Sequence, residues 1–377
     1  MSVTATPARE AAPPAVRRRL VVEPRALPSP AVRVGAVAGS VLAALLVGAL
    51  VLLVLGEDPW ATYRSMYDSS LGSSLVFSQT LVRAAPLVLT AAAAAVAYRM
   101  RVYTIGQDGQ LIAGAIVSSG VALAIGPHLA GLPTVAVVLA IGVLGGALWA
   151  LIPALARAYL STNVVLSTLM MNFIALGLMN YLVVGSMSPW RDKANAAAAQ
   201  AAPIPAQAGL PHLFQQADVG IVIAVAVALL LAAAVRLTRW GFELRVVGDS
   251  VEAARYAGID VAKHVVGVVC LSGALCGLAG AIQVTSVTQA LDPAGVDPGL
   301  GLGYTGIVVA ALARLGLIAS VPVAVLMAAL LNAGPALQLI GVPSALVVVL
   351  QGTILLFVAA SQFLLSYRVR RAGEMSS

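Results

Sequence analysis

The residues of this sequence that could act chemically are a few polar side chains that interrupt long apolar runs. They are Asp108, Gln110, Asn163, Thr168, Asn172, Gln283 and Thr305. Amides and hydroxyls exchange hydrogen bonds with a polar solute, whereas the single carboxylate of this set lacks a partner for acid–base catalysis. Polar side chains in such surroundings normally face a path or one another. We therefore predict that these residues line a route for a polar solute.

Two parts of this set have alternative interpretations that the sequence leaves open. Asp108 lies between Gly106 and Gly109 at the join of two apolar runs, which suits either a broken backbone beside a path or an ordinary cytoplasmic turn. Thr168 and Asn172 are four residues apart and share one helix face, with Asn163 off that face. The side chains of Thr168 and Asn172 could therefore line the solute path or form hydrogen bonds between helices.

Catalytic and metal-binding patterns are not found in the sequence. No G-x-x-x-x-G-K-[ST] loop for nucleotide phosphates is present. His128, His212 and His264 are scattered without the spacing of metal ligands. We therefore expect no catalytic residue, no metal site and no bound cofactor in this chain.

The composition places the chain in a lipid bilayer. Apolar residues make up 60% and charged residues 10% of the 377 positions, against about 45–50% and about 25% in soluble proteins. Helices that cross about 30 Å of hydrocarbon need about 20 apolar residues. We predict an all-α bundle of ten spans at 34–55, 75–98, 108–126, 134–156, 163–184, 219–237, 264–289, 302–316, 318–340 and 343–366.

Glycine pairs spaced by four residues predict close contacts between these spans. The pairs are Gly142 with Gly146, Gly273 with Gly277, and Gly299 with Gly303. Small residues at this spacing let two helix backbones approach. We expect internal packing rather than dimerisation.

Positive charge predicts the orientation. With the N-terminus inside, only Arg64, Arg83, Arg191 and Lys193 of the 22 Lys and Arg residues fall outside. Because Lys and Arg concentrate on the cytoplasmic side, both termini are expected in the cytoplasm. The net charge of +7 is thus attributed to topology, and no nucleic-acid partner is expected.

The same reading divides the chain into a membrane domain with two tails and two long loops. We predict a disordered basic cytoplasmic tail over 1–31, a transmembrane domain over 32–367 and a cytoplasmic tail over 368–377. Within the membrane domain, residues 185–218 form an outer loop rich in proline. Residues 236–263 form the longest inner loop.

The inner loop carries the signals of a short helix. Asp249 or Ser250 can cap it, Glu252 suits its positive N-terminal end, and Gly258 can end it. Ala253, Ala254 and Ala257 would give it a small smooth face, flanked by Arg255. Such a helix suits insertion into a groove of a partner, and the alternative is a solvated connector.

The string Glu252-Ala253-Ala254 with Gly258 resembles the E-A-A-x-x-x-G loop by which permeases of bacterial ABC importers contact their ATPase subunits. Further segments, in order, resemble the permeases for simple sugars and nucleosides. They are TLVRAAPLVLT at 80–90, TIGQDGQ at 104–110, TNVVLSTLMMN at 162–172, SGALCGLAG at 272–280 and GYTGIVVA at 303–310. Thr104, Asp108 and Val164 stand where that family has Asn, Glu and Glu.

The resemblance implies a permease subunit in the bacterial cell membrane that imports a nucleoside or a simple sugar. It implies that ATP is bound by a separate ATPase, that a second permease pairs with this chain in a heterodimer, and that a substrate-binding lipoprotein delivers the solute from outside. The segment Glu57 to Tyr63 looks like that of the longer permease of nucleoside-type pairs. The coupling residues it implies are Asp249, Glu252, Ala253, Ala254, Arg255 and Gly258.

A secondary transporter driven by an ion gradient is the alternative function. Such a protein is expected to hold ionisable groups deep in its spans. Asp108 is the only acidic candidate within reach of a span in this sequence, and the E-A-A loop would have no purpose there.

Overall fold

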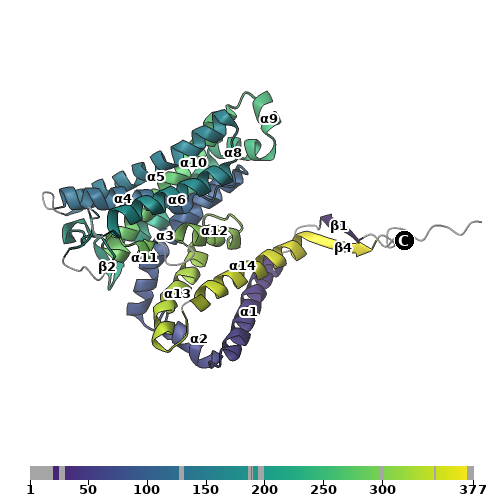
Figure 1. Ribbon diagram of the computed structural model, residues 1–377. Helices are drawn as coiled ribbons and strands as arrows, with labels where there is room; N and C mark the ends of the chain where they lie inside the picture. The colour runs from purple at the N-terminus through teal and green to yellow at the C-terminus, as the bar shows by residue number, and fades with distance from the viewer. Residues whose placement is uncertain are drawn as a thin grey trace, which may run out of the picture.

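A computed structural model describes residues 20–24, 30–126, 131–185, 188, 190–193, 199–296, 301–343 and 345–371. Over these ranges the chain is a bundle of helices with two pairs of short strands (Figure 1). Seven of the described helices are long and apolar enough to cross a membrane. This confirms the all-helical, polytopic architecture predicted from the sequence.

Each of the ten predicted spans overlaps a helix of the structure. The helices are α1 Pro30–Val54, α3 Ser74–Arg99, α4 Gln107–Ile125, α5 Leu132–Leu160, α6 Val164–Val183, α7 Val219–Leu237, α10 Val261–Ile282, α12 Leu302–Leu312, α13 Ser320–Leu339 and α14 Ala345–Ser366. A π-helix, η2, continues α10 over Gln283–Thr288. Shorter helices are α2 Pro59–Asp68, α8 Arg239–Asp249, α9 Val251–Tyr256, α11 Pro293–Val296 and the single turn η1 Ala206–Ala208.

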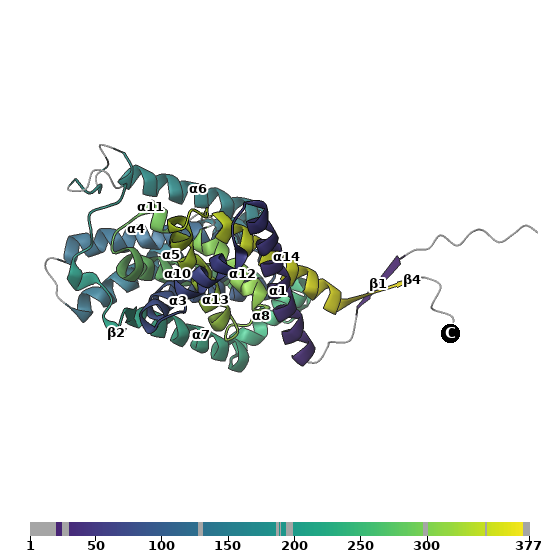
Figure 2. The same ribbon diagram turned by 90° about the horizontal axis from the view of Figure 1, so that it is seen from below.

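Helix α3 forms the centre of the bundle because the residues of its second half are mostly small and apolar. Its most apolar 18-residue window is 89% buried, and the alanines of its second half are fully enclosed. Helices α7, α10, α12 and α13 all contact it. Figure 2 shows α6 and α7 along opposite sides of the bundle.

The predicted glycine pairs of α5 and α10 pack against each other. A Cβ added at Gly146 would meet the backbone of Gly273 and Gly277, and one at Gly142 would meet the Gly277 carbonyl. The prediction of internal packing is confirmed for these two pairs. Gly299, of the third pair, lies outside the described residues.

Helix α12 is shorter than the span predicted over 302–316. It has 11 residues and so rises only about 16 Å, roughly half of the hydrocarbon thickness. Arg314 and Leu315 follow with positive φ angles of 52° and 59°, a conformation that ends a right-handed helix. The eighth span is therefore corrected to a half-length helix.

The two ends of the membrane domain meet in a strand pair. Strand β1, Leu20–Pro24, pairs antiparallel with β4, Tyr367–Arg371, beside the adjacent helices α1 and α14 (Figures 1 and 2). The start of α1 and the end of α14 therefore lie on the same side of the bundle. Within the predicted disordered tail, this described segment is extended and paired, and most of 1–31 lies outside the described residues.

The two ends of the bundle carry different structures. Helices α8 and α9 lie at one end, and strand β2, His212–Phe214, with α11 lies at the other (Figure 1). Strand β2 pairs with β3, Ala217–Asp218. At this end the predicted outer loop is tied to the segment after the π-helix, because Ala201 N donates to Leu291 O at 2.9 Å and Ile204 N to Gln289 O at 2.9 Å.

Candidate functional site

Asn172 joins three elements near the start of α4. Its Oδ1 accepts a hydrogen bond from Gly109 N at 2.9 Å. Its Nδ2 donates to Ile105 O at 2.8 Å and to the Tyr304 hydroxyl at 3.0 Å. The side chain thus fixes the turn before α4 to α6 and α12, and the hydrogen bonds between helices considered for Asn172 are present.

Thr168 and Asp108 complete this buried cluster. Thr168 Oγ1 accepts from Ile105 N at 3.3 Å and donates to Val164 O at 2.7 Å. Asp108 Oδ1 accepts from Gly303 N at 2.6 Å, so a carboxylate meets the N-terminal N–H groups of α12, where negative charge is favourable. Both side chains are buried. Asp108 therefore lies inside the bundle and joins α4 to α12.

Two glutamines beside this cluster are buried without partners. The side-chain amides of Gln107 and Gln110 are almost fully enclosed, and neither the oxygen nor the nitrogen of either has a hydrogen-bond partner among the described residues. Buried polar groups in native proteins are nearly always paired with protein or water. The amides of Gln107 and Gln110 are therefore free to hydrogen-bond water or a polar solute. Gln107 was missed in the sequence, where only Gln110 was selected.

The remaining predicted polar residues lie apart from the cluster. Asn163 is exposed and caps α6 by accepting from Val165 N at 2.9 Å. Thr305 is buried and donates to Gly301 O at 2.9 Å, within the first turn of α12. Gln283 begins the π-helix and faces a cavity. The structure thus brings Asp108, Gln110, Thr168 and Asn172 together and places the other three elsewhere.

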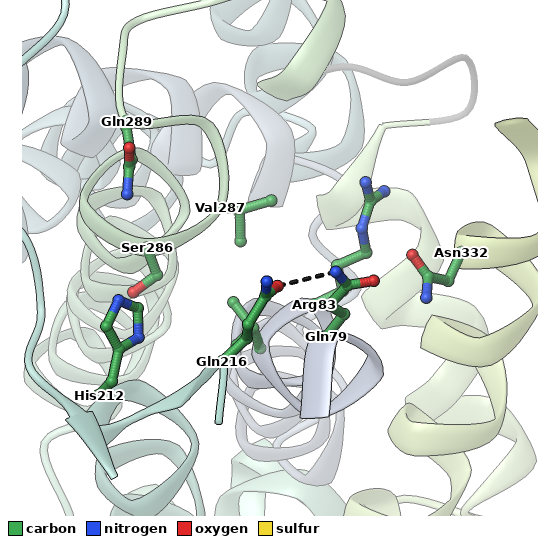
Figure 3. A pocket seen from close by; sticks show the side chains of 9 residues that line it. Gln79, Arg83, His212, Gln216, Ser286, Val287, Gln289 and Asn332 are labelled. Atoms are coloured by element: carbon green, nitrogen blue, oxygen red, sulfur yellow. Dashed lines mark hydrogen bonds between the residues drawn. The ribbon is translucent and has the colours of Figure 1, made fainter. Parts of the chain in front are cut away.

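Two adjacent cavities lie between α3, the π-helix and α13. They measure about 470 Å³ and about 710 Å³ and share the lining residues Arg83 and Val287. We call the two together the Arg83 chamber. Figure 3 shows the Arg83 side chain between Val287 and Asn332, above a hydrogen bond from Gln79 Nε2 to Gln216 Oε1 of 2.8 Å. Ligand sites in proteins commonly have volumes of about 300–1,000 Å³.

A buried carboxyl lies beside the smaller cavity. Asp218 caps α7 by accepting from Gly220 N at 2.8 Å. Burial raises the pKa of this carboxyl, and the neighbouring Ser286 hydroxyl, the Gly220 N–H and His212 act in the opposite direction. Ser286 and His212 themselves line the cavity. The lining is thus polar here, with an imidazole and a hydroxyl that neighbour a buried carboxyl.

At the other end of the bundle, the segment 236–263 contains two short helices, α8 and α9, where one was predicted from the sequence. Thr238 caps α8 by accepting from Gly241 N at 3.3 Å. The buried residues of α8 are Gly241, Leu244, Val247 and Gly248, a helical spacing that was present in the sequence but was missed. Glu243 of α8 contacts His264 of α10, with Oε2 and Nε2 2.9 Å apart.

Helix α9 has the predicted caps. Ser250 Oγ accepts from Ala253 N at 3.2 Å, so Ser250 is the N-cap. Asp249 instead ends α8 and forms an exposed ion pair of 3.9 Å with Arg101. Gly258 has φ +77° and ends the helix, with Ile259 N donating to Ala254 O at 3.0 Å. The prediction that Gly258 stops the helix is confirmed.

The exposed surface of α9 differs from the predicted alanine face. Ala254 is fully buried against the rest of the chain, whereas Glu252, Ala253, Arg255 and Ala257 are exposed. Tyr256 is 98% exposed, although the sequence analysis did not select it. Ala254 therefore anchors α9 to its own chain, and the surface open to a partner is centred on Ala253 and Tyr256.

Comparison with known proteins identifies the family. The family model for the branched-chain amino acid transport system / permease component matches residues 76–359. The glucose ABC transporter permease protein of Haloferax volcanii is 33% identical over 88% of this chain and 88% of its own. The guanosine ABC transporter permease protein of Bacillus subtilis is 31% identical over 85% of this chain and 92% of its own.

A third relative, the nucleoside ABC transporter permease protein of Lactococcus lactis, is 29% identical over 88% of this chain and 92% of its own. No solved structure matches the chain significantly. The family match covers well over half of the sequence and includes the buried polar cluster, the Arg83 chamber and α9. The chain therefore belongs to the branched-chain amino acid transport system / permease component family, as a multi-pass membrane permease that is not itself an enzyme.

Proposed function

We propose that this chain is the permease subunit of an ABC importer that carries a nucleoside or a simple sugar. The relatives named for glucose, guanosine and nucleosides match nearly its whole length, and this is the observation that carries the proposal. ATP is bound and hydrolysed by a separate ATPase subunit. A second permease completes the membrane part in a heterodimer, and a binding lipoprotein supplies the solute.

The proposed path for the solute uses only part of the predicted polar set. Gln110 has an enclosed amide without a partner and Gln283 faces the larger cavity, so both are proposed to line the path. Asp108, Thr168, Asn172 and Thr305 hydrogen-bond to backbone groups around it, so they are proposed to hold the helices in place. Asn163 is proposed only to cap α6.

The orientation is proposed from charge and from the paired ends of the membrane domain. Arg99, Arg101 and Arg157 lie in loops or helix ends near α8 and α9, which supports a cytoplasmic location for that end. The pairing of β1 with β4 supports an even number of crossings. Both termini are then cytoplasmic, and the β2–β3 hairpin faces outward.

Helix α9 is proposed to transmit the ATPase cycle to the membrane helices. It is short, exposed on the side of Ala253 and Tyr256, and anchored through Ala254. A fully exposed tyrosine is a residue type that carries binding energy in many interfaces. Segment 249–258 therefore has the form of a projection that fits into a partner, rather than of a solvated connector.

Co-purification tests this contact. Ala253→Arg adds a long charged side chain to the exposed face of α9, and Tyr256→Ala removes its largest exposed group. Both variants are expected to lose the ATPase from detergent-purified complexes and to lose uptake. Tyr67→Ala, which removes an exposed tyrosine from α2, is the matched control and should retain both. If both α9 variants keep the ATPase and transport normally, α9 is not the coupling element.

A further inference from the structure

Arg83 is a cation inside the apolar helix α3. It lies two turns into α3, whose residues from Ala84 to Ala97 are buried. No carboxylate lies within ion-pair distance of its guanidinium among the described residues. Charged groups inside membrane segments are costly and normally pair or mark a solute path. Arg83 faces both cavities of the chamber, so its natural partner is a molecule that enters them.

The backbone around Arg83 is irregular on both sides of the chamber. Pro86 has no N–H to donate to the carbonyl of Val82, and Val82 lines the smaller cavity. Across the chamber, the π-helix places Gln283, Val287 and Thr288 on the larger cavity. Single π-turns within α-helices are frequent at functional sites. Both irregularities thus occur where the two helices face the same space.

The larger cavity also contains one carboxylate. Asp292 lines it together with Arg83, and its Oδ1 accepts from Ala294 N at 3.0 Å. A ligand therefore meets a guanidinium fork that only donates, a carboxylate that only accepts, and amides that do both. The apolar part of the lining, which we call the apolar wall, includes Leu331, Pro335 and Val347.

We propose that the Arg83 chamber is the solute-binding site of this permease and takes a neutral ring that carries adjacent hydroxyl groups. Hydroxyl oxygens accept hydrogen bonds from Arg83 while hydroxyl hydrogens are donated to Asp292, and the ring face lies on the apolar wall. Arg83 and Asp292 give the larger cavity one positive and one negative lining group, so a neutral solute suits it better than an ion that one of the two groups would repel. The inference rests on the proposed function, because it assigns a site to the solute of that importer.

The test measures solute binding and transport separately. Permease, second permease and ATPase are reconstituted in nanodiscs without binding protein, and equilibrium binding of labelled guanosine and labelled glucose is measured. Arg83→Gln and Asp292→Asn are each expected to weaken binding of the preferred solute by about tenfold or more, the usual effect of removing a hydrogen bond to a charged group. Asn caps helices as well as Asp does, so Asp292→Asn preserves α11.

Charge selection gives a second readout that a misfolded variant would not reproduce. Guanosine monophosphate should compete poorly in the wild-type complex and better after Asp292→Asn, because the repelling carboxylate is gone. Arg64→Gln is the control, since it removes an arginine whose ion pair with Asp68 is exposed and worth little. This variant should bind as the wild type does.

The outcomes separate the two proposals. ATP-driven uptake by the wild-type transporter in proteoliposomes is measured in parallel. If that uptake occurs but both chamber variants bind guanosine and glucose as the wild type does, or the wild-type complex binds neither, the chamber is not the solute site. If the wild-type transporter shows no ATP-driven uptake of either solute, the proposed function itself fails.

Discussion

Asn172 and Gln110 are both buried amides near the start of α4, but their surroundings give them opposite roles. Asn172 has three hydrogen-bond partners, and two of them are backbone groups, Ile105 O before α4 and Gly109 N in its first turn. Gln110 has none among the described residues. Removing one member of a buried hydrogen bond leaves the other member unpaired and lowers the free energy of unfolding by about 1–3 kcal/mol. Removing a polar group that has no partner causes no such loss.

Replacement of each by leucine is therefore expected to separate stability from transport. Asn172→Leu should lower the thermal unfolding midpoint of the purified complex, because Gly109 N and Ile105 O lose their partner. Gln110→Leu should leave that midpoint unchanged or raise it, yet reduce uptake if its amide lines the path. A normal uptake rate for Gln110→Leu would remove it from the path, and an unchanged midpoint for Asn172→Leu would contradict the structural role.

At this scale the sequence identified which residues are polar inside the bundle but not what they contact. The spacing of Thr168 and Asn172 predicted that they share one helix face, and in the structure both lie on the buried face of α6. Their partners lie on the turn before α4 and on α12, so tertiary packing decided the roles. Arg83 occurs in a recognisable stretch, but the sequence does not show where the acidic residues lie in three dimensions, and no described carboxylate pairs with it.

Among the elements, α9 depends on a glycine that no other residue replaces at equal cost. Gly258 has φ +77° and Gly267 in α10 has ordinary helical geometry, and an added Cβ meets no heavy atom within 4 Å at either position. Gly258→Ala should therefore destabilise α9 by about 1–2 kcal/mol, while Gly267→Ala should stabilise α10 by about 0.5–1 kcal/mol.

Proteolysis and uptake would measure this difference. Faster cleavage within 249–260 and weaker coupling of ATP hydrolysis to uptake are expected for Gly258→Ala only. Because steric space is equal at the two sites, equal behaviour of the two variants would show that the left-handed end of α9 has no functional importance.

The existence of the helices was predictable because long apolar runs in a membrane have one solution, the hydrogen-bonded helix. The lengths of the helices were less predictable. Residues 306–316 are apolar apart from Arg314, yet α12 ends at Leu312 because the chain turns at Arg314 and Leu315. Helix α8 was missed because its buried face is made partly of Gly241 and Gly248, which do not add to an apolar pattern.

For the whole molecule, the orientation predicts opposite accessibility at its two ends. In a background with Cys270 and Cys276 replaced by alanine, Leu213→Cys in β2 should react with an impermeant thiol reagent on intact cells. Tyr256→Cys in α9 should react only after the membrane is permeabilised. Both parent side chains are exposed in the structure, so access depends on the side of the membrane. Labelling of both cysteines on intact cells would contradict the proposed topology.

The central claim is that separate ATPase subunits drive transport through this permease. The most direct measurement is uptake of labelled guanosine and glucose by proteoliposomes that contain both permeases, the ATPase and the binding protein. The expected result is uptake that requires ATP on the side of α9 and persists when proton and sodium gradients are collapsed. Uptake that follows an imposed ion gradient without ATP would contradict the account and identify a secondary transporter.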